Sequence, residues 1–149
     1  MKEHDMAHQD EGHYRAKHGN AAPPAQAVLD AAKESAKDGM ITCAAAHGIA
    51  KRLNVTPEDV GRAVDFQELK ISKCQLGLFG YGKGVKLVKA AESVPADLER
   101  EIRAALMDGR ISCRDLWNIA DARKMARQDA ANACEKLGIR ISRCQLGAF

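Results

Sequence analysis

The 149-residue sequence predicts a mainly α fold with a short β-hairpin, built from two repeats of one unit. The first observation is a duplication. Ile-Ser-Lys-Cys-Gln-Leu-Gly-Leu-Phe, which ends at Phe79, returns as Ile-Ser-Arg-Cys-Gln-Leu-Gly-Ala-Phe, which ends at Phe149. The second is composition: aromatic residues make up 4% of the chain and alanine is abundant, which favours small, closely packed helices over a sheet sandwich. The third is helical spacing of apolar residues, as at Leu98, Ile102 and Leu106.

One fixed offset of 70 residues aligns the two copies without a gap. In this register Cys43 falls on Cys113, and the Cys-Gln-Leu-Gly motif at residues 74–77 falls on residues 144–147. Matches that share one offset over most of the copy indicate a duplicated unit and not a chance similarity of composition.

The alignment divides the chain into three parts. Residues 1–23 form a polar, His-rich tail whose composition cannot bury a core, so we expect it to be disordered. Its histidines recur every four or five residues, but a solvated tail explains them more simply than a metal site. Repeat 1 covers residues 24–93, and repeat 2 covers residues 94–149.

Each repeat is expected to open with a helix, at residues 25–37 and 95–107, with Asp-Gly at its end because glycine suits the left-handed position there. Thr42 and Ser112 are then good N-caps for a second helix.

The rest of repeat 1 predicts a third helix and a hairpin. Thr56 is placed to cap a helix that starts at Pro57 and ends near Gln67. Residues 69–75 are β-branched and partly alternating, which is typical of a strand. A glycine-rich bend follows, and residues 85–88 suit the returning strand of a β-hairpin.

Three helices, a tight turn between the second and third, and then a β-hairpin resemble the winged helix-turn-helix family. Residues 49–60 carry the resemblance, because Leu53 and Val60 suit the small core and Val55 suits the turn. Repeat 2 matches less well, since Arg123 replaces Leu53. The resemblance implies two winged helix-turn-helix-like repeats and a DNA-binding regulator, with third helices in the major groove and the wing on the DNA backbone.

Candidate DNA contacts are cations and amides of both repeats. The third helix of repeat 1 is a poor DNA contact because Glu58, Asp59 and Asp65 accompany its Arg62. The hairpin is better suited, with five lysines and no acid over residues 69–91. The third helix of repeat 2 carries Arg, Gln and Asn side chains, which form bidentate contacts with bases. The candidate set is Arg62, Lys70, Lys73, Lys83, Lys86, Lys89, Arg127, Gln128, Asn132, Arg140 and Arg143.

Two alternatives stay open: a non-catalytic protein-interaction module of the same architecture, and a cysteine-based metal or redox sensor. Cys43 and Cys113 directly follow an N-cap, where helix amides favour a thiolate. Core packing is the favoured interpretation, because cysteine is among the most buried residue types and no pair has zinc-knuckle spacing. No set of residues suggests catalysis, a resident metal or a cofactor, so we do not expect an enzyme.

Hydropathy, cysteine count and net charge indicate where the protein acts and what it binds. The chain has no apolar run that could span a membrane, and its polar start lacks the apolar core of a signal peptide. An odd number of cysteines, five, suggests reduced thiols in a cytoplasm. The net charge of +3 is too small to argue for nucleic acid alone. We therefore expect a cytoplasmic protein with duplex DNA as partner, and with a homodimer or a protein partner as further options.

Overall fold

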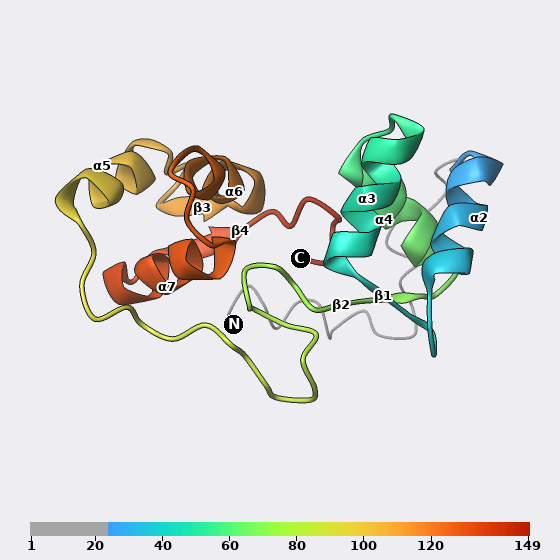
Figure 1. Cartoon of the computed structure of the whole chain (residues 1–149), viewed down its shortest axis with the longest axis horizontal. Coiled ribbons are helices and arrows are strands. Elements are labelled where there is room, and N and C mark those ends of the chain that lie inside the picture. The colour runs from blue at the N-terminus through green and yellow to red at the C-terminus, as the bar shows by residue number, and fades with distance from the viewer. Residues whose placement is uncertain (1–23) are drawn as a thin grey trace.

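The computed structural model describes residues 24–149, and it shows a mainly helical chain with short strands, arranged as two similar repeats side by side (Figure 1). The elements of repeat 1 are α2 (Gln26–Ser35), β1 (Met40–Thr42), α3 (Cys43–Leu53), α4 (Pro57–Phe66) and β2 (Lys70–Ser72). Those of repeat 2 are α5 (Ala96–Ala104), β3 (Arg110–Ser112), α6 (Cys113–Ala122), α7 (Arg127–Leu137) and β4 (Arg140–Ser142). None of the helices described is long and apolar enough to cross a membrane. The histidine-rich tail lies outside the described residues.

The expected helix starts are confirmed. The Thr42 hydroxyl accepts the backbone N–H of Ala45 at 3.0 Å and caps α3, and Ser112 caps α6 in the same way. Thr56 and Asp59 form a capping box at the start of α4, each side chain accepting the other's backbone N–H. These caps satisfy helix N–H groups that would otherwise lack partners.

The Asp-Gly pairs act differently from the expectation. Helix α2 ends at Ser35, and Asp38 and Gly39 follow as the two central residues of a tight turn, with φ of 52° and 75°. Lys37 and Met40 exchange backbone hydrogen bonds of 2.8 and 2.9 Å across this turn. Positive φ at both central residues is typical of a type I′ turn, which favours Asp-Gly and reverses the chain directly into β1.

The expected β-hairpin is not formed. Strand β2 pairs in parallel with β1, so that Ile71 lies opposite Ile41, and β4 pairs in parallel with β3 in repeat 2. Residues 85–88 form no strand, because the N–H groups of Leu87 and Val88 both bond to the carbonyl of Gly77. The β-branched residues at 69–75 therefore indicated a strand correctly, but its partner is the strand before α3.

The core of each repeat is a helix pair with a third helix across it. In repeat 1, α2 and α3 both pack on α4, and Ile49, Val60 and Val64 are almost wholly buried between them. In repeat 2, α6 packs on α7, and Leu116 of α6 is fully buried. The expected place of Val60 in the small core is confirmed.

The two repeats meet through residues at the same position of each copy. The rings of His47 and Trp117 lie 4.3 Å apart between centroids, and those of Phe79 and Phe149 lie 6.0 Å apart, edge to face. Both pairs differ by the offset of the duplication. Contact of a residue with its own counterpart is the property of an interface about a twofold axis. The repeats are therefore arranged like the halves of a symmetric dimer.

The Cys-Gln-Leu-Gly turns, residues 74–77 and 144–147, extend this interface. In each turn the glycine N–H donates to the cysteine carbonyl at 2.9 Å. The turn of repeat 2 approaches α4 of repeat 1 so closely that a Cβ on Gly61 would lie 1.9 Å from the carbonyl oxygen of Leu146. The turn of repeat 1 lies on α7, where a Cβ on Gly77 would meet Gln128 at 3.2 Å. Each turn thus rests on the last helix of the other repeat, and Figure 1 shows the C-terminus beside repeat 1.

Candidate nucleic-acid interface

The lysine segment, residues 69–91, begins with a folded loop. Lys73 follows β2 with a φ of 50°, and its N–H donates to the carbonyl of Gly80 at 3.1 Å. A Cβ on Gly80 would lie 2.3 Å from the Lys73 nitrogen, so only glycine fits this close return of the chain. The Tyr81 hydroxyl donates to the Cys74 carbonyl at 2.6 Å. The loop is therefore held by its own backbone and by one tyrosine.

The second half of the lysine segment is fixed on α7 of repeat 2. Gln128 donates its side-chain amide to the carbonyl of Leu87 at 3.2 Å. Asn132 accepts the Lys89 N–H on its side-chain oxygen at 2.9 Å and the Ala91 N–H on its backbone carbonyl at 3.1 Å. A segment without regular structure thus has a defined path across another repeat.

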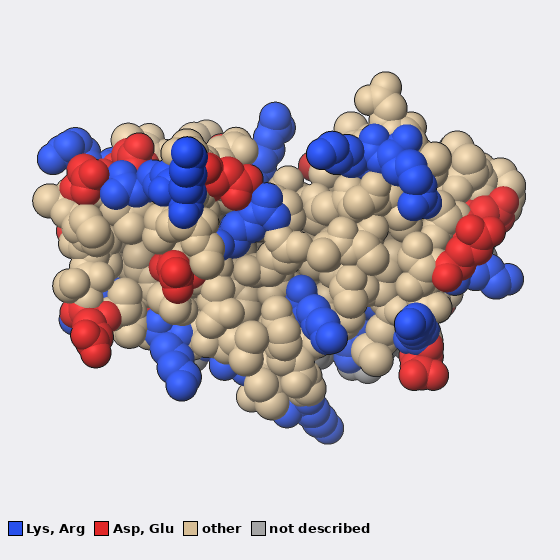
Figure 2. Space-filling view, viewed as in Figure 1, with Lys and Arg blue, Asp and Glu red and all other residues tan. Residues whose placement is uncertain are grey.

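This path presents lysine side chains to solvent. Lys73, Lys83 and Lys89 are exposed, and Lys70 and Lys86 are half-buried. The Lys86 ammonium lies 3.9 Å from a carboxylate oxygen of Glu135, a distance at which a partly exposed pair contributes little. Figure 2 shows Lys and Arg side chains around the loop that Figure 1 draws below the two repeats. The lysine segment is therefore an exposed cationic surface on a defined backbone.

The base-reading side chains expected on α7 are engaged inside the molecule. The Arg127 guanidinium lies 3.7 Å from the centroid of the Trp117 ring, donates to Asp121 at 2.9 and 3.0 Å, and also donates to Gln75. Its hydrogen bonds hold the pKa of Asp121 below the usual value. With Gln128 and Asn132 bonded to the lysine segment, these three side chains act as a support and are not presented to a DNA groove.

Helix α4 has a different exposed surface from the one expected. Glu58 is exposed and Asp59 belongs to the capping box, while Arg62 lies 3.8 Å from Asp59. Asp65, expected in solvent, is 5% exposed and therefore buried. The start of α4 remains acidic, and its one candidate cation lies beside an acid.

Arg140 and Arg143 repeat the positions of Lys70 and Lys73. Both arginines are exposed, at the start of β4 and just after it, and Arg143 has a φ of 51° like its counterpart Lys73. The duplication thus places a pair of cations at the same point of each parallel strand pair, and in repeat 1 three further lysines follow.

Four of the five cysteines pack in the core, and Cys144 is half-buried. Cys43, Cys74, Cys113 and Cys134 are buried, as favoured from the sequence. Burial raises the pKa of the Cys43 and Cys113 thiols to about 12, which outweighs the effect of the helix N-terminus expected to favour a thiolate. Among residues 24–149 no group of three or more His, Cys, Asp or Glu side chains is placed to hold a metal ion.

Sequence reasoning missed the residues that join the repeats. In the sequence Gly61 is an ordinary glycine in the middle of a helix, and only the structure shows Leu146 packed against it. Likewise, only the structure shows that Gln75 accepts a hydrogen bond from Arg127. The available signal was the repetition of Cys-Gln-Leu-Gly itself, a motif that is not part of the general winged-helix pattern. Comparison with protein families, with curated proteins and with solved structures finds no match to this chain.

Proposed function

We propose that this protein binds duplex DNA through the phosphate backbone, with the lysine segment as the contact surface. One observation carries the proposal: residues 69–91 contain five lysines and no acid, and α7 holds the second half of this segment in a defined path. Cations on a fixed surface displace counterions from DNA without first losing the conformational freedom of a loose loop. Arg140 and Arg143 supply further cations in repeat 2.

The mode of binding follows from what the helices present. Helix α4 begins with acids, which repel phosphates, and the polar side chains of α7 hold the lysine segment. Neither helix therefore supplies a free set of base-reading side chains, and contacts to phosphate carry little sequence information. We expect affinity that depends steeply on salt and weakly on DNA sequence.

A triple variant of the lysine segment tests the proposal. Lys83→Ala, Lys86→Ala and Lys89→Ala together should lower affinity for random duplex DNA and reduce the slope of log affinity against log salt by about three, roughly one for each lysine. The measurement is a titration of fluorescent duplex at several salt concentrations.

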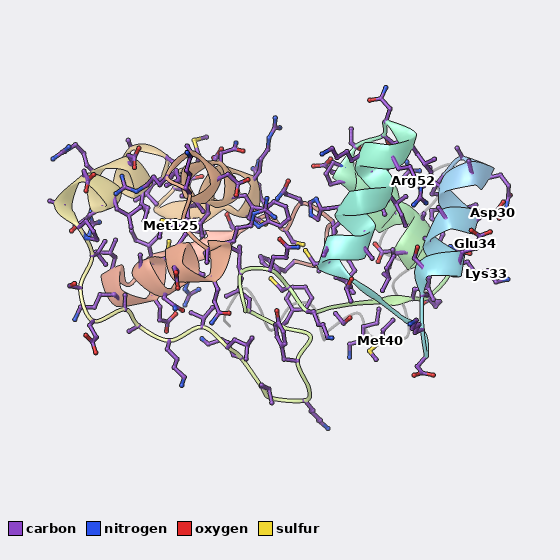
Figure 3. All side chains as sticks on the ribbon, in the orientation of Figure 1. Asp30, Lys33, Glu34, Met40, Arg52 and Met125 are labelled. Atoms are coloured by element: carbon purple, nitrogen blue, oxygen red, sulfur yellow. The ribbon has the colours of Figure 1, made fainter. Side chains whose placement is uncertain are left out.

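The matched control removes the same charge elsewhere. Lys33, Lys51 and Arg100 are exposed on helices, and Figure 3 shows Lys33 on α2 at the outer edge of repeat 1. Changing these three to alanine should leave the salt slope close to that of the parent chain. Equal losses in both triple variants would mean that only net charge matters, and would sink the assignment to the lysine segment.

The acidic start of α4 supports a second function, docking of a protein partner. Glu58 is exposed there beside Asp59, on the helix that the winged-helix resemblance would place against DNA. A chain that fails to bind duplex at low salt would favour this second function. Retention of a basic protein that is lost in Glu58→Gln would then support it.

A further inference from the structure

We infer that each Cys-Gln-Leu-Gly turn is a docking element for the last helix of the opposite repeat, which makes this chain the single-chain counterpart of a twofold dimer. The partner surface is the last helix of the other repeat, α4 or α7, and that other repeat carries the same turn. The inference concerns the junction of the repeats and does not rest on nucleic-acid binding.

The contact at α4 explains a glycine that the helix itself does not need. Gly61 lies in the middle of α4, where glycine is less favourable than alanine. A side chain there would overlap the backbone of Leu146, with its carbonyl oxygen at 1.9 Å and its carbonyl carbon at 2.6 Å from the Cβ position. Backbone atoms cannot give way as a flexible side chain can. The glycine therefore admits the turn of repeat 2.

The reciprocal contact lies on α7. Gln75 of the first turn accepts a hydrogen bond from Arg127, and Gly77 lies against the side chain of Gln128. Ala131 occupies the position equivalent to Gly61 and is 1% exposed. Both last helices thus carry a small buried residue at this position, and the first turn makes its contacts with α7 through Arg127 and Gln128.

The symmetry relation separates this arrangement from an ordinary contact between neighbouring domains. Phe79 and Phe149, two residues beyond the two turns, meet edge to face at an interplanar angle of 82°. His47 also meets its counterpart, Trp117, between α3 and α6, with the two rings tilted by 38°. A head-to-tail arrangement joins unlike surfaces and would not bring counterparts together at two places.

A chain cut after folding tests the inference. A protease recognition sequence placed after Ser93, where Glu92 and Ser93 are exposed, allows the folded full chain to be cleaved between the repeats. The two halves should then co-elute in size-exclusion chromatography and remain bound on dilution. Gly61→Ala should raise the dissociation constant of the halves at least about tenfold.

The matched control is Gly48→Ala. Gly48 is also a helix residue, in α3, but a Cβ there meets nothing within 4 Å, so this variant shares the helix-propensity gain without the overlap. Equal dissociation constants for the two variants, or halves of the parent chain that separate on cleavage, would overturn the inference.

A second variant keeps the test decisive if circular dichroism shows that Gly61→Ala is unfolded. Phe149→Ala removes the ring that meets Phe79 but keeps the backbone carbonyl that accepts the Cys144 N–H at 3.1 Å. Its halves should also separate more readily than those of the Gly48→Ala control. Unchanged association of the halves would contradict a docking role for this end of the turn.

Discussion

The two repeats share one backbone frame, but their last helices are used differently. In repeat 1, α4 starts with Pro57 and an acidic capping box. In repeat 2, α7 starts with Arg127, which stacks on Trp117 and reaches Gln75 of the other repeat. The lysines lie in repeat 1, whereas the side chains that hold the second half of their segment lie in repeat 2. The comparison teaches that the two repeats kept the same backbone fold while their surface residues took different roles: repeat 1 carries the lysines, and repeat 2 supports the segment that bears them.

The counterparts on the twofold axis differ in chemistry as well as in size. Position 47 holds a histidine, and the equivalent position 117 holds a tryptophan whose ring nitrogen is buried without a hydrogen-bond partner among the described residues. Burial, and then the nearby Arg127 cation, lower the pKa of His47 to about 4, while Glu58 acts weakly in the opposite direction. Of the two residues that meet at this junction, His47 can therefore gain a proton and Trp117 cannot.

The largest effect we predict is a change in the pH dependence of stability when His47 is replaced. Because the folded chain holds His47 neutral to about pH 4 while the unfolded chain protonates it near pH 6.5, stability should fall as pH falls between these values. The slope is at most about 1.4 kcal/mol per pH unit. His47→Phe keeps a ring against Trp117 but cannot gain a proton, so its urea-unfolding free energy should fall less over this range. Identical slopes for both chains would contradict the role given to His47.

A smaller effect should come from exchanging the starts of α4 and α7. Thr56→Ala removes the cap of α4 and should lower the free energy of unfolding by about 1 kcal/mol. The equivalent residue of repeat 2, Ala126, has no cap bond, although its backbone conformation is similar and Asp129 follows three residues later. Ala126→Thr should therefore complete a capping box and raise stability by up to about 1 kcal/mol. Chemical denaturation of both variants checks the pair. A loss of stability in both would show that the two helix starts are not equivalent.

Local features of the fold were predictable from the sequence, and contacts between distant segments were not. The offset between Cys43 and Cys113 revealed the duplication, and Thr42, Thr56 and Ser112 marked helix starts because capping depends on adjacent residues. The parallel pairing of β1 with β2 was missed, because three-residue strands are too short for alternation to indicate a partner. The winged-helix resemblance supplied an antiparallel hairpin instead.

The candidate site was predictable to a similar degree. The lysines between residues 69 and 91 were visible as a charge pattern, and Lys73, Lys83 and Lys89 are exposed in the structure. The hydrogen bonds of Gln128 and Asn132 to the lysine segment could not be predicted from the sequence, because they form only when the two repeats pack together. Residue type alone identified groups that can bind bases but not whether they remain available to do so.

The most direct test of the claim that the lysine segment contacts DNA is a lysine-modification footprint of the intact chain with and without random duplex DNA. Mild acetylation followed by mass spectrometry reports every lysine of both repeats in one experiment. We predict that DNA protects Lys73, Lys83 and Lys89 and leaves exposed Lys33, Lys51 and Lys124 unprotected. Protection of Lys51 or Lys124 with the lysine segment still reactive would contradict the account and place DNA on the helices instead.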